Sequence, residues 1–220
     1  MTDTNTPLVL REDDERGVIT LTLNRPNAFN SLSEDLLNAL QQEIDAISKN
    51  SKVRVVVIGA SGKAFCAGHD LREMRAEPSL SYYQNLFNKC GHMMMSLQKL
   101  QVPVIAKVQG IATAAGCQLV AQCDLAVASS DAKFAVSGVN LGLFCATPSV
   151  ALSRNLSRKA AFEMLVTGDF IDAVEALSKG LINRIAEPEN LDATVEALVS
   201  KILAKPQVVL AMGKELFYMQ

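Results

Sequence analysis

A stretch of small residues between Gly110 and Ala128, "GIATAAGCQLVAQCDLAVA", is the first candidate for chemistry in this chain. The small side chains from Ala112 to Gly116 allow a backbone to approach a ligand closely, or a helix to pack tightly on a strand. The next polar side chain is Gln118, whose amide can hold a water or a carbonyl but cannot exchange protons near neutral pH. The stretch therefore indicates a ligand site without a general base at this position.

Few other side chains could transfer a proton or attack a substrate. His69 has a suitable pKa, but it follows a turn that can point its side chain outward, and His92 is expected in the core or on the surface. Cys66 and Cys117 are expected to be small buried thiols, with a reactive thiol as the alternative. The five cysteines form no CxxC pair, which predicts reduced thiols and no metal site.

Composition and charge favour one soluble globular domain. The chain has 220 residues, of which 49% are hydrophobic and 20% are charged, and its formal net charge is -2. Its lysines and arginines are scattered, so nucleic acid and anionic membranes are not expected partners. Polar residues interrupt the longest apolar region, from Val102 to Ala128, which predicts core rather than a membrane span. Early acidic residues and the lack of an apolar targeting region predict a cytoplasmic protein.

The elements that would position these residues alternate between strands and helices and then become helical, which favours an α/β core followed by helices. Strands are expected at 17–23, 53–60, 102–110, 124–129, 133–136 and 181–187. Helices are expected at 33–49 with Ser33 as N-cap, 79–100, 115–122, 147–153, 157–166, 172–178, 191–203 and from Pro206 to the end. The last helix exposes an apolar face, so either a partner covers it or the chain is cut short.

Four stretches together resemble the enoyl-CoA hydratase/isomerase (crotonase) superfamily, in the order and spacing of that family. They are "TLNRPNAFNSLS" (22–33), "VVVIGASGKAFCAGHDL" (55–71), "VPVIAKVQGIATAAGCQLVAQCDLAVASSDAKFAV" (102–136) and "LVTGDFIDAVEALSKGLINRI" (165–185). The resemblance implies an α/β crotonase (ClpP-like) fold of repeated ββα units with a C-terminal helical region. It further implies a core domain over 1–186 and a helical trimerisation region over 187–220, which is incomplete by the family pattern. A homotrimer or a hexamer built as a dimer of trimers is the expected assembly.

The same resemblance implies an acyl-CoA thioester as ligand. Coenzyme A would then be part of the substrate, with no permanently bound cofactor, and the activity would be that of a lyase or isomerase of fatty acid metabolism. By the family pattern, the backbone N–H groups of His69 and Ala115 form an oxyanion hole, in which one donor is worth roughly 3–4 kcal/mol. Alanines at 114 and 115, where many members have glycine, keep these donors provided that neither position needs a positive φ.

By resemblance, coenzyme A lies along the loops "RPNAF" and "CAGHDLR". Arg25 or Arg72 would meet a phosphate, with a solvated surface charge as the alternative for each. Asp70 belongs to the same candidate set, but it is expected to anchor its own loop or cap the following turn. The residues expected to give backbone and apolar contacts to adenine and pantetheine are Ala28, Phe29, Gly68 and Leu71.

Two glutamates transfer protons in hydratases of this family, and neither is present here. Their positions hold Gln118 and Gly138. The known hydratase and isomerase machinery is therefore missing, which leaves two hypotheses. One is an enzyme that stabilises an enolate without the glutamate pair, by thioester hydrolysis, decarboxylation or a substrate-assisted reaction. The other is a non-catalytic acyl-CoA binder or regulatory subunit.

Overall fold

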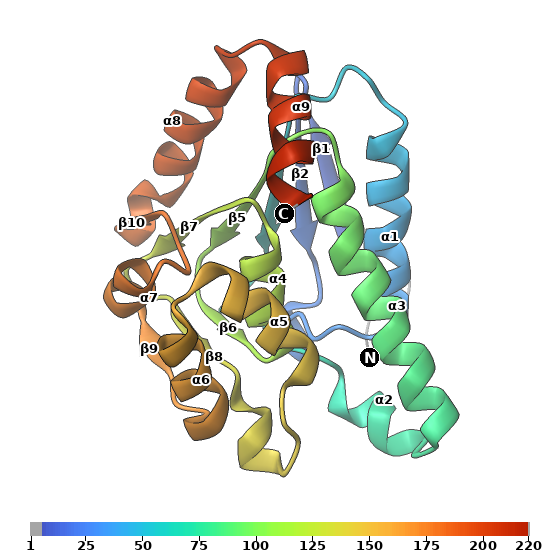
Figure 1. Cartoon of the computed structure of the whole chain (residues 1–220). Helices are drawn as coiled ribbons and strands as arrows, with labels where there is room; N and C mark the ends of the chain where they lie inside the picture. Colours follow the sequence, from blue (N-terminus) through green and yellow to red (C-terminus); the bar gives the residue numbers. More distant parts are fainter. Residues whose placement is uncertain (1–5, 220) are drawn as a thin grey trace.

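The strands form two sheets in the computed structural model, which describes residues 6–219 (Figure 1). The larger sheet has the order β1-β2-β3-β5-β7-β10 and the smaller one the order β4-β6-β8-β9. Their bounds are β1 Val9–Asp13, β2 Val18–Leu23, β3 Val55–Ala60, β4 Ala64–Cys66, β5 Val104–Val108, β6 Ile111–Thr113, β7 Leu125–Ser129, β8 Lys133–Ala135, β9 Ile171–Asp172 and β10 Arg184–Ala186. All pairs are parallel except β1 with β2 and β8 with β9.

The helices follow pairs of strands, which confirms the expected repeat of ββα units. In three successive units the first strand (β3, β5, β7) joins the larger sheet and the second (β4, β6, β8) joins the smaller one. The helices of the repeats are α1 Glu34–Ser48, α2 Leu71–Ala76, α3 Leu80–Lys99, α4 Ala115–Gln122 and α5 Ala146–Asn155. The trailing helices are α6 Arg158–Thr167, α7 Ala173–Lys179, α8 Leu191–Leu203 and α9 Gln207–Tyr218. Short 3-10 turns lie at Pro26–Ala28 (η1), Ser137–Leu141 (η2) and Pro188–Asn190 (η3).

Strand β3 is buried on both faces, as its unbroken run of valines predicts. Val56 and Ile58 face the main core, to which α1 and α3 contribute, whereas Val55 and Val57 pack in a second cluster with residues of α8. Figure 1 shows α1 and α3 side by side, with α8 across the larger sheet. The division into domains at residue 186 stays a prediction.

Helix α9 is held to the sheets by a buried ion pair. Lys214 Nζ lies 2.7 Å from Asp124 Oδ2 and also donates to the carbonyl oxygens of Leu97 and Val102. The Tyr218 hydroxyl donates to the other oxygen of Asp124. Between residues 6 and 219, no helix is both long enough and apolar enough to cross a membrane.

The sequence-based prediction missed the shortest elements. Strands β1 and β9 and helix α2 were not expected, β4 was assigned to a loop, and β6 lies in the unassigned residues between the expected strand 102–110 and the expected helix 115–122. Strands of three residues carry too few positions for a periodic pattern. Two of these missed strands, β4 and β6, are the elements that position the candidate site.

Candidate functional site

The parallel pairing of β4 with β6 brings together the two segments that hold the predicted oxyanion donors. Cys66 pairs with Ala112, so the residues that follow the two strands emerge at the same edge of the sheet. Gly68 lies against the start of α4, because a Cβ added there would be 3.2 Å from the Ala115 nitrogen. Its φ of +89° also favours glycine. His69, the next residue, is thereby placed beside Ala115.

Neither predicted donor has an acceptor within residues 6–219. Ala115 is the first residue of α4, where N–H groups have no partner within the helix and the helix dipole is positive. His69 forms a parallel bridge with Leu32, in which Leu32 N–H donates to Gly68 O and Asp70 N–H donates to Leu32 O. In this pattern the N–H of His69 points away from Leu32. Among residues 6–219, neither the His69 nor the Ala115 N–H donates to a backbone or side-chain acceptor.

Ala114 has an unusual backbone conformation immediately before these donors, with φ 51° and ψ -122°. The prediction for these donors required that neither alanine have a positive φ. Ala114 does have one, whereas Ala115 does not. An alanine methyl in this region is strained, at a cost of about 1–3 kcal/mol. The N–H of Ala114 donates to Ala135 O at 3.0 Å, which ties the strained residue to β8.

Gln118 is buried on the first turn of α4, with 5% of its surface exposed. Within the part of the chain that the structure describes, its Oε1 is buried and has no hydrogen-bond partner. An unpaired buried acceptor costs about 1–3 kcal/mol, so this oxygen favours a ligand that brings a donor. The amide remains neutral, so it can hold a ligand without exchanging protons.

The His69 side chain points inward, contrary to the expectation that it can point outward. Its ring packs edge-on against Phe87 of α3, with ring centroids 5.1 Å apart. Its Nε2 is buried and finds no partner in residues 6–219. Burial lowers the pKa of this imidazole to about 4, so the ring is neutral at pH 7 and is a weak base. The other histidine, His92, is exposed on α3.

Position 138 has no room for a side chain. A Cβ on Gly138 would lie 2.6 Å from the backbone oxygen of Leu143 and 2.7 Å from Cys145 Sγ. Position 138, where the resemblance implies the second glutamate, thus offers only its backbone. A glutamate placed here would force the segment after η2 to move.

The two loops expected to contact coenzyme A lie side by side. The Ala67 N–H donates to Phe29 O, next to the bridge between Leu32 and His69. Phe29 and Leu71 are 57% and 51% exposed, which leaves their apolar surfaces available to a ligand.

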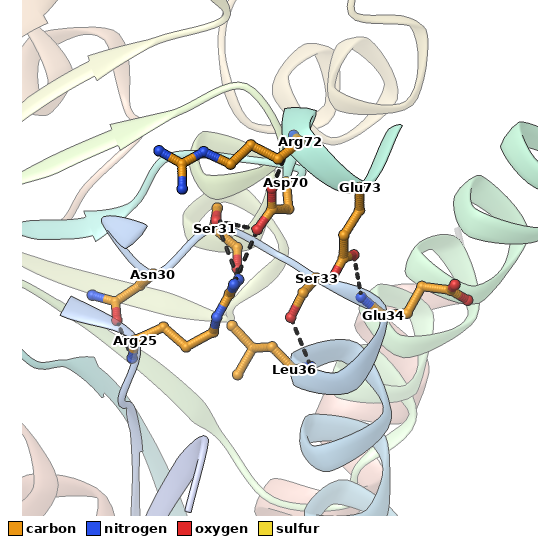
Figure 2. A network of polar contacts seen from close by, with 9 residues as sticks. All are labelled: Arg25, Asn30, Ser31, Ser33, Glu34, Leu36, Asp70, Arg72 and Glu73. Atoms are coloured by element: carbon orange, nitrogen blue, oxygen red, sulfur yellow. Dashed lines mark hydrogen bonds and ion pairs between the residues drawn. The ribbon is translucent and has the colours of Figure 1, made fainter. Parts of the chain in front are cut away.

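The two candidate arginines differ. Arg25 Nη2 lies 3.0 Å from Asp70 Oδ2 and its Nη1 donates to Ser31, so the structure does not favour Arg25 as a phosphate ligand. Arg72 is exposed, and its side chain makes no hydrogen bond or ion pair to any described residue. In Figure 2 its guanidinium extends away from the polar network.

Asp70 anchors its loop and caps α2. This agrees with the expectation of a structural role for Asp70. Its Oδ1 accepts the N–H of Arg72 at 3.0 Å and its Oδ2 faces Arg25. Burial alone raises the pKa of Asp70, but the hydrogen bonds from Arg25 and from the Arg72 N–H outweigh it and keep the pKa below its usual range. This carboxylate is therefore ionised and engaged within the protein.

The cysteines are free and buried throughout the described residues. Burial raises the pKa of the Cys66 and Cys117 thiols to about 12, which fits inert thiols rather than nucleophiles. No group of three side chains suited to a metal ion occurs between residues 6 and 219.

The sequence analysis missed Asn30, which is fully buried beside the site. Its Oδ1 accepts the Arg25 N–H, and its Nδ2 donates to the carbonyl oxygens of Ser61 and Ala64. Asn30 adopts a φ of 53°, a conformation that asparagine tolerates better than most residues. An asparagine between turn-forming residues was the signal available for it.

Comparison with known proteins identifies strong similarities over nearly the whole chain. The sequence model described as "Enoyl-CoA hydratase/isomerase" matches residues 13–220. A mitochondrial enoyl-CoA hydratase domain-containing protein 3 from Xenopus laevis is 45% identical over 98% of this chain and 73% of its own length. The short-chain-enoyl-CoA hydratase of Clostridium acetobutylicum is 34% identical over 92% of this chain and 78% of its own length.

Solved structures agree with the fold. An enoyl-CoA hydratase from Mycobacterium smegmatis has a TM-score of 0.96 and 63% identity, over 97% of this chain and 83% of that one. The human enoyl-CoA hydratase domain-containing protein 3 has a TM-score of 0.93 and 41% identity, over 97% of this chain and 84% of that one. The predicted α/β crotonase fold is confirmed.

These comparisons correct the expected location. The relatives from Xenopus laevis, rat and human carry "mitochondrial" in their names, which points away from the cytoplasm. The expectation of a cytoplasmic protein rested on the composition of the first residues, a weaker signal than these similarities.

The crowding at position 138 predicts the effect of adding a methyl group there. Gly138→Ala should lower the free energy of unfolding by roughly 1–3 kcal/mol, because the new Cβ meets a backbone oxygen. Gly91→Ala in α3 is the control, because its added Cβ meets nothing within 4 Å, and it should raise stability by about 1 kcal/mol. Urea denaturation measures both. Equal midpoints for the two variants would show that space exists at 138.

The buried imidazole predicts a pH dependence of stability. Between pH 6.5 and about pH 4, residue 69 is protonated in the unfolded chain but not in the folded chain. Stability therefore falls as the pH falls through this range. The full loss is roughly 3 kcal/mol. His69→Leu should reduce the difference in unfolding free energy between pH 7 and pH 4.5, whereas the exposed His92→Gln should not. An unchanged difference in His69→Leu would contradict the burial of this ring.

Proposed function

The chain belongs to the enoyl-CoA hydratase/isomerase family, and from this premise we propose that it binds an acyl-CoA thioester through an oxyanion hole. The thioester oxygen accepts hydrogen bonds from the N–H groups of His69 and Ala115. The observation that carries this proposal is the juxtaposition of two unpartnered N–H groups, one of them at a helix N-terminus. Such rigid donors stabilise the negative charge of an enolate better than mobile water does.

In this proposal Gln118 holds the acyl group rather than moving protons. Its amide is buried one turn after Ala115 and has an unpaired oxygen. Coenzyme A extends over the exposed Phe29 and Leu71, and Arg72 is the arginine available for a phosphate. Coenzyme A is part of the ligand, and we propose no permanently bound cofactor.

A homotrimer or a hexamer is the proposed assembly, in the setting of fatty acid metabolism. Exposed large apolar residues on α9 support an interface between subunits. They include Val208, Val209, Met212, Leu216 and Phe217. The ligand class alone supports the metabolic setting.

The two functional hypotheses differ in whether the bound thioester is turned over. The site lacks both glutamates, His69 is a weak base and Gly138 has no side chain, so nothing described here activates a water for hydration. Decarboxylation fits this site better than hydration. The bond between the α carbon and the carboxylate breaks and carbon dioxide leaves, while the electron pair of that bond forms the enolate that the two N–H groups stabilise. A water then protonates the α carbon and becomes hydroxide. A non-catalytic acyl-CoA binder is the second candidate, favoured by the same absence of a base.

Proline at position 115 tests the proposed hole, because it deletes one donor at the first residue of α4. Ala115→Pro should weaken the binding of crotonyl-CoA about tenfold or more in isothermal titration calorimetry. Arg158→Pro, at the exposed first position of α6, is the matched control and should bind as the wild type does. Equal affinities in folded Ala115→Pro and wild type would contradict the assignment of this donor.

Product analysis separates the two candidates. Enoyl-, hydroxyacyl-, malonyl- and aryl-CoA esters are incubated with the wild type and followed by mass spectrometry. Conversion of a malonyl-type ester supports the decarboxylase, and binding of esters without any product supports the binder. If no ester binds, the proposed function is wrong.

The position of Gln118 predicts a gain of chemistry on changing its amide to a carboxylate. Gln118→Glu should catalyse exchange of the α protons of butyryl-CoA in D2O, because a base then faces the carbon next to the polarised carbonyl. A positioned base contributes about 100-fold or more. Gln122→Glu is the control, on the same helix and 7% exposed. NMR loss of the α-proton signal measures the exchange. A folded Gln118→Glu that binds the ester without exchange would place residue 118 away from that carbon.

A further inference from the structure

We propose that Arg25, Asn30 and Asp70, here called the loop clamp, are positioning residues for the His69 N–H. This inference rests on the proposed function, because it concerns one donor of the proposed oxyanion hole. The loop clamp makes no contact with the thioester. It sets the orientation of a backbone group that does.

His69 needs such support because it lies in neither a helix nor a named strand. Its backbone is held by the bridge to Leu32, through the Gly68 O and the Asp70 N–H on either side of it. The direction of the His69 N–H therefore depends on where Leu32 lies. An oxyanion donor must be held within roughly 10–20° of its productive direction.

Leu32 in turn belongs to a loop whose backbone is irregular. Phe29 and Asn30 have φ values of 50° and 53°, and no strand runs between β2 and α1. Backbone hydrogen bonds form a short 3-10 turn at Pro26–Ala28, and buried side chains add to them in holding the residues that follow. Asn30 does so from a fully buried position, with three hydrogen bonds of 2.8 Å to Arg25 N, Ser61 O and Ala64 O.

Arg25 connects the two residues that flank the bridge. Its guanidinium donates to Ser31 O at 2.7 Å, next to Leu32, and to Asp70 Oδ2 at 3.0 Å, next to His69. Figure 2 shows Arg25 reaching from its own loop toward Ser31 and Asp70. One side chain thus spans both sides of the bridge, and its planar fork suits this double contact.

Asp70 extends the connection into α2. One carboxylate oxygen accepts the Arg72 N–H at the start of the helix, and the other faces Arg25. The side chains of Arg25 and Asp70 are only 22% and 11% exposed, so water screens this pair less than a surface pair. Because Asp70 directly follows His69, a rotation of its backbone also turns the His69 N–H.

The infrared carbonyl stretch of bound butyryl-CoA, labelled with ¹³C at the thioester carbon, tests the loop clamp. Hydrogen bonds from the hole polarise this carbonyl and lower its stretching frequency. Arg25→Met keeps the aliphatic stem and loses the fork, so the frequency shift should fall to about half and the Kd should rise about threefold, less than the roughly tenfold cost of deleting a donor. Arg25→Lys should recover part of the shift.

Arg11→Met is the matched control. Arg11 is 26% exposed and pairs with Asp13 and Glu43 on β1 and α1, so its loss removes a similar ion pair outside the site. The full carbonyl shift should remain in this variant. A general loss of stability would move both variants alike, whereas loss of positioning moves only the Arg25 variant.

Asp70→Asn provides a second test if Arg25→Met fails to fold. Asparagine retains an N-cap for α2 but loses the charge that faces Arg25. A folded Asp70→Asn or Arg25→Met with the full carbonyl shift would overturn the loop clamp and leave the proposed function intact. If the wild type binds the ester without any frequency shift, the proposal of an oxyanion hole is wrong. The loop clamp, which depends on that proposal, is then wrong as well.

Discussion

The close contact between α4 and β4 is the constraint on which the candidate site depends. A Cβ on Gly116 would lie 2.0 Å from the backbone oxygen of Cys66, so only glycine lets the helix start against the end of that strand. Gly68 allows the same approach from the other segment. Because these contacts are between backbones, they bring the segments that carry the two N–H groups close together.

The site shows a division between backbone and side-chain chemistry. Every residue except proline carries a backbone N–H, so the residue types at positions 69 and 115 leave both donors in place. Proton transfer depends on side chains, and neither Gln118 nor Gly138 carries a carboxylate. The strained Ala114 shows that even a costly backbone conformation is retained here.

Tertiary contacts change the roles of His69 and Arg25, which were candidates because of their residue types. Histidine is a good base in water, but His69 packs on Phe87 and loses basicity. Arginine is a good phosphate ligand when its fork is free, but the fork of Arg25 is engaged by Ser31 and Asp70. Phe87 and Asp70 come from distant parts of the chain, so no local pattern contains these two contacts.

The sequence by itself determined the α/β class, the long helices and buried strands, and the family, because periodic apolar residues and ordered motifs are local signals. It also showed that positions 118 and 138 hold no acidic side chain, since this follows from residue identity alone. Only the tertiary structure decided that position 138 is closed, that Asn30 is buried beside the site, and that Ala114 is strained. These are properties of space between segments, and that space exists only once β4, β6 and α4 have packed together.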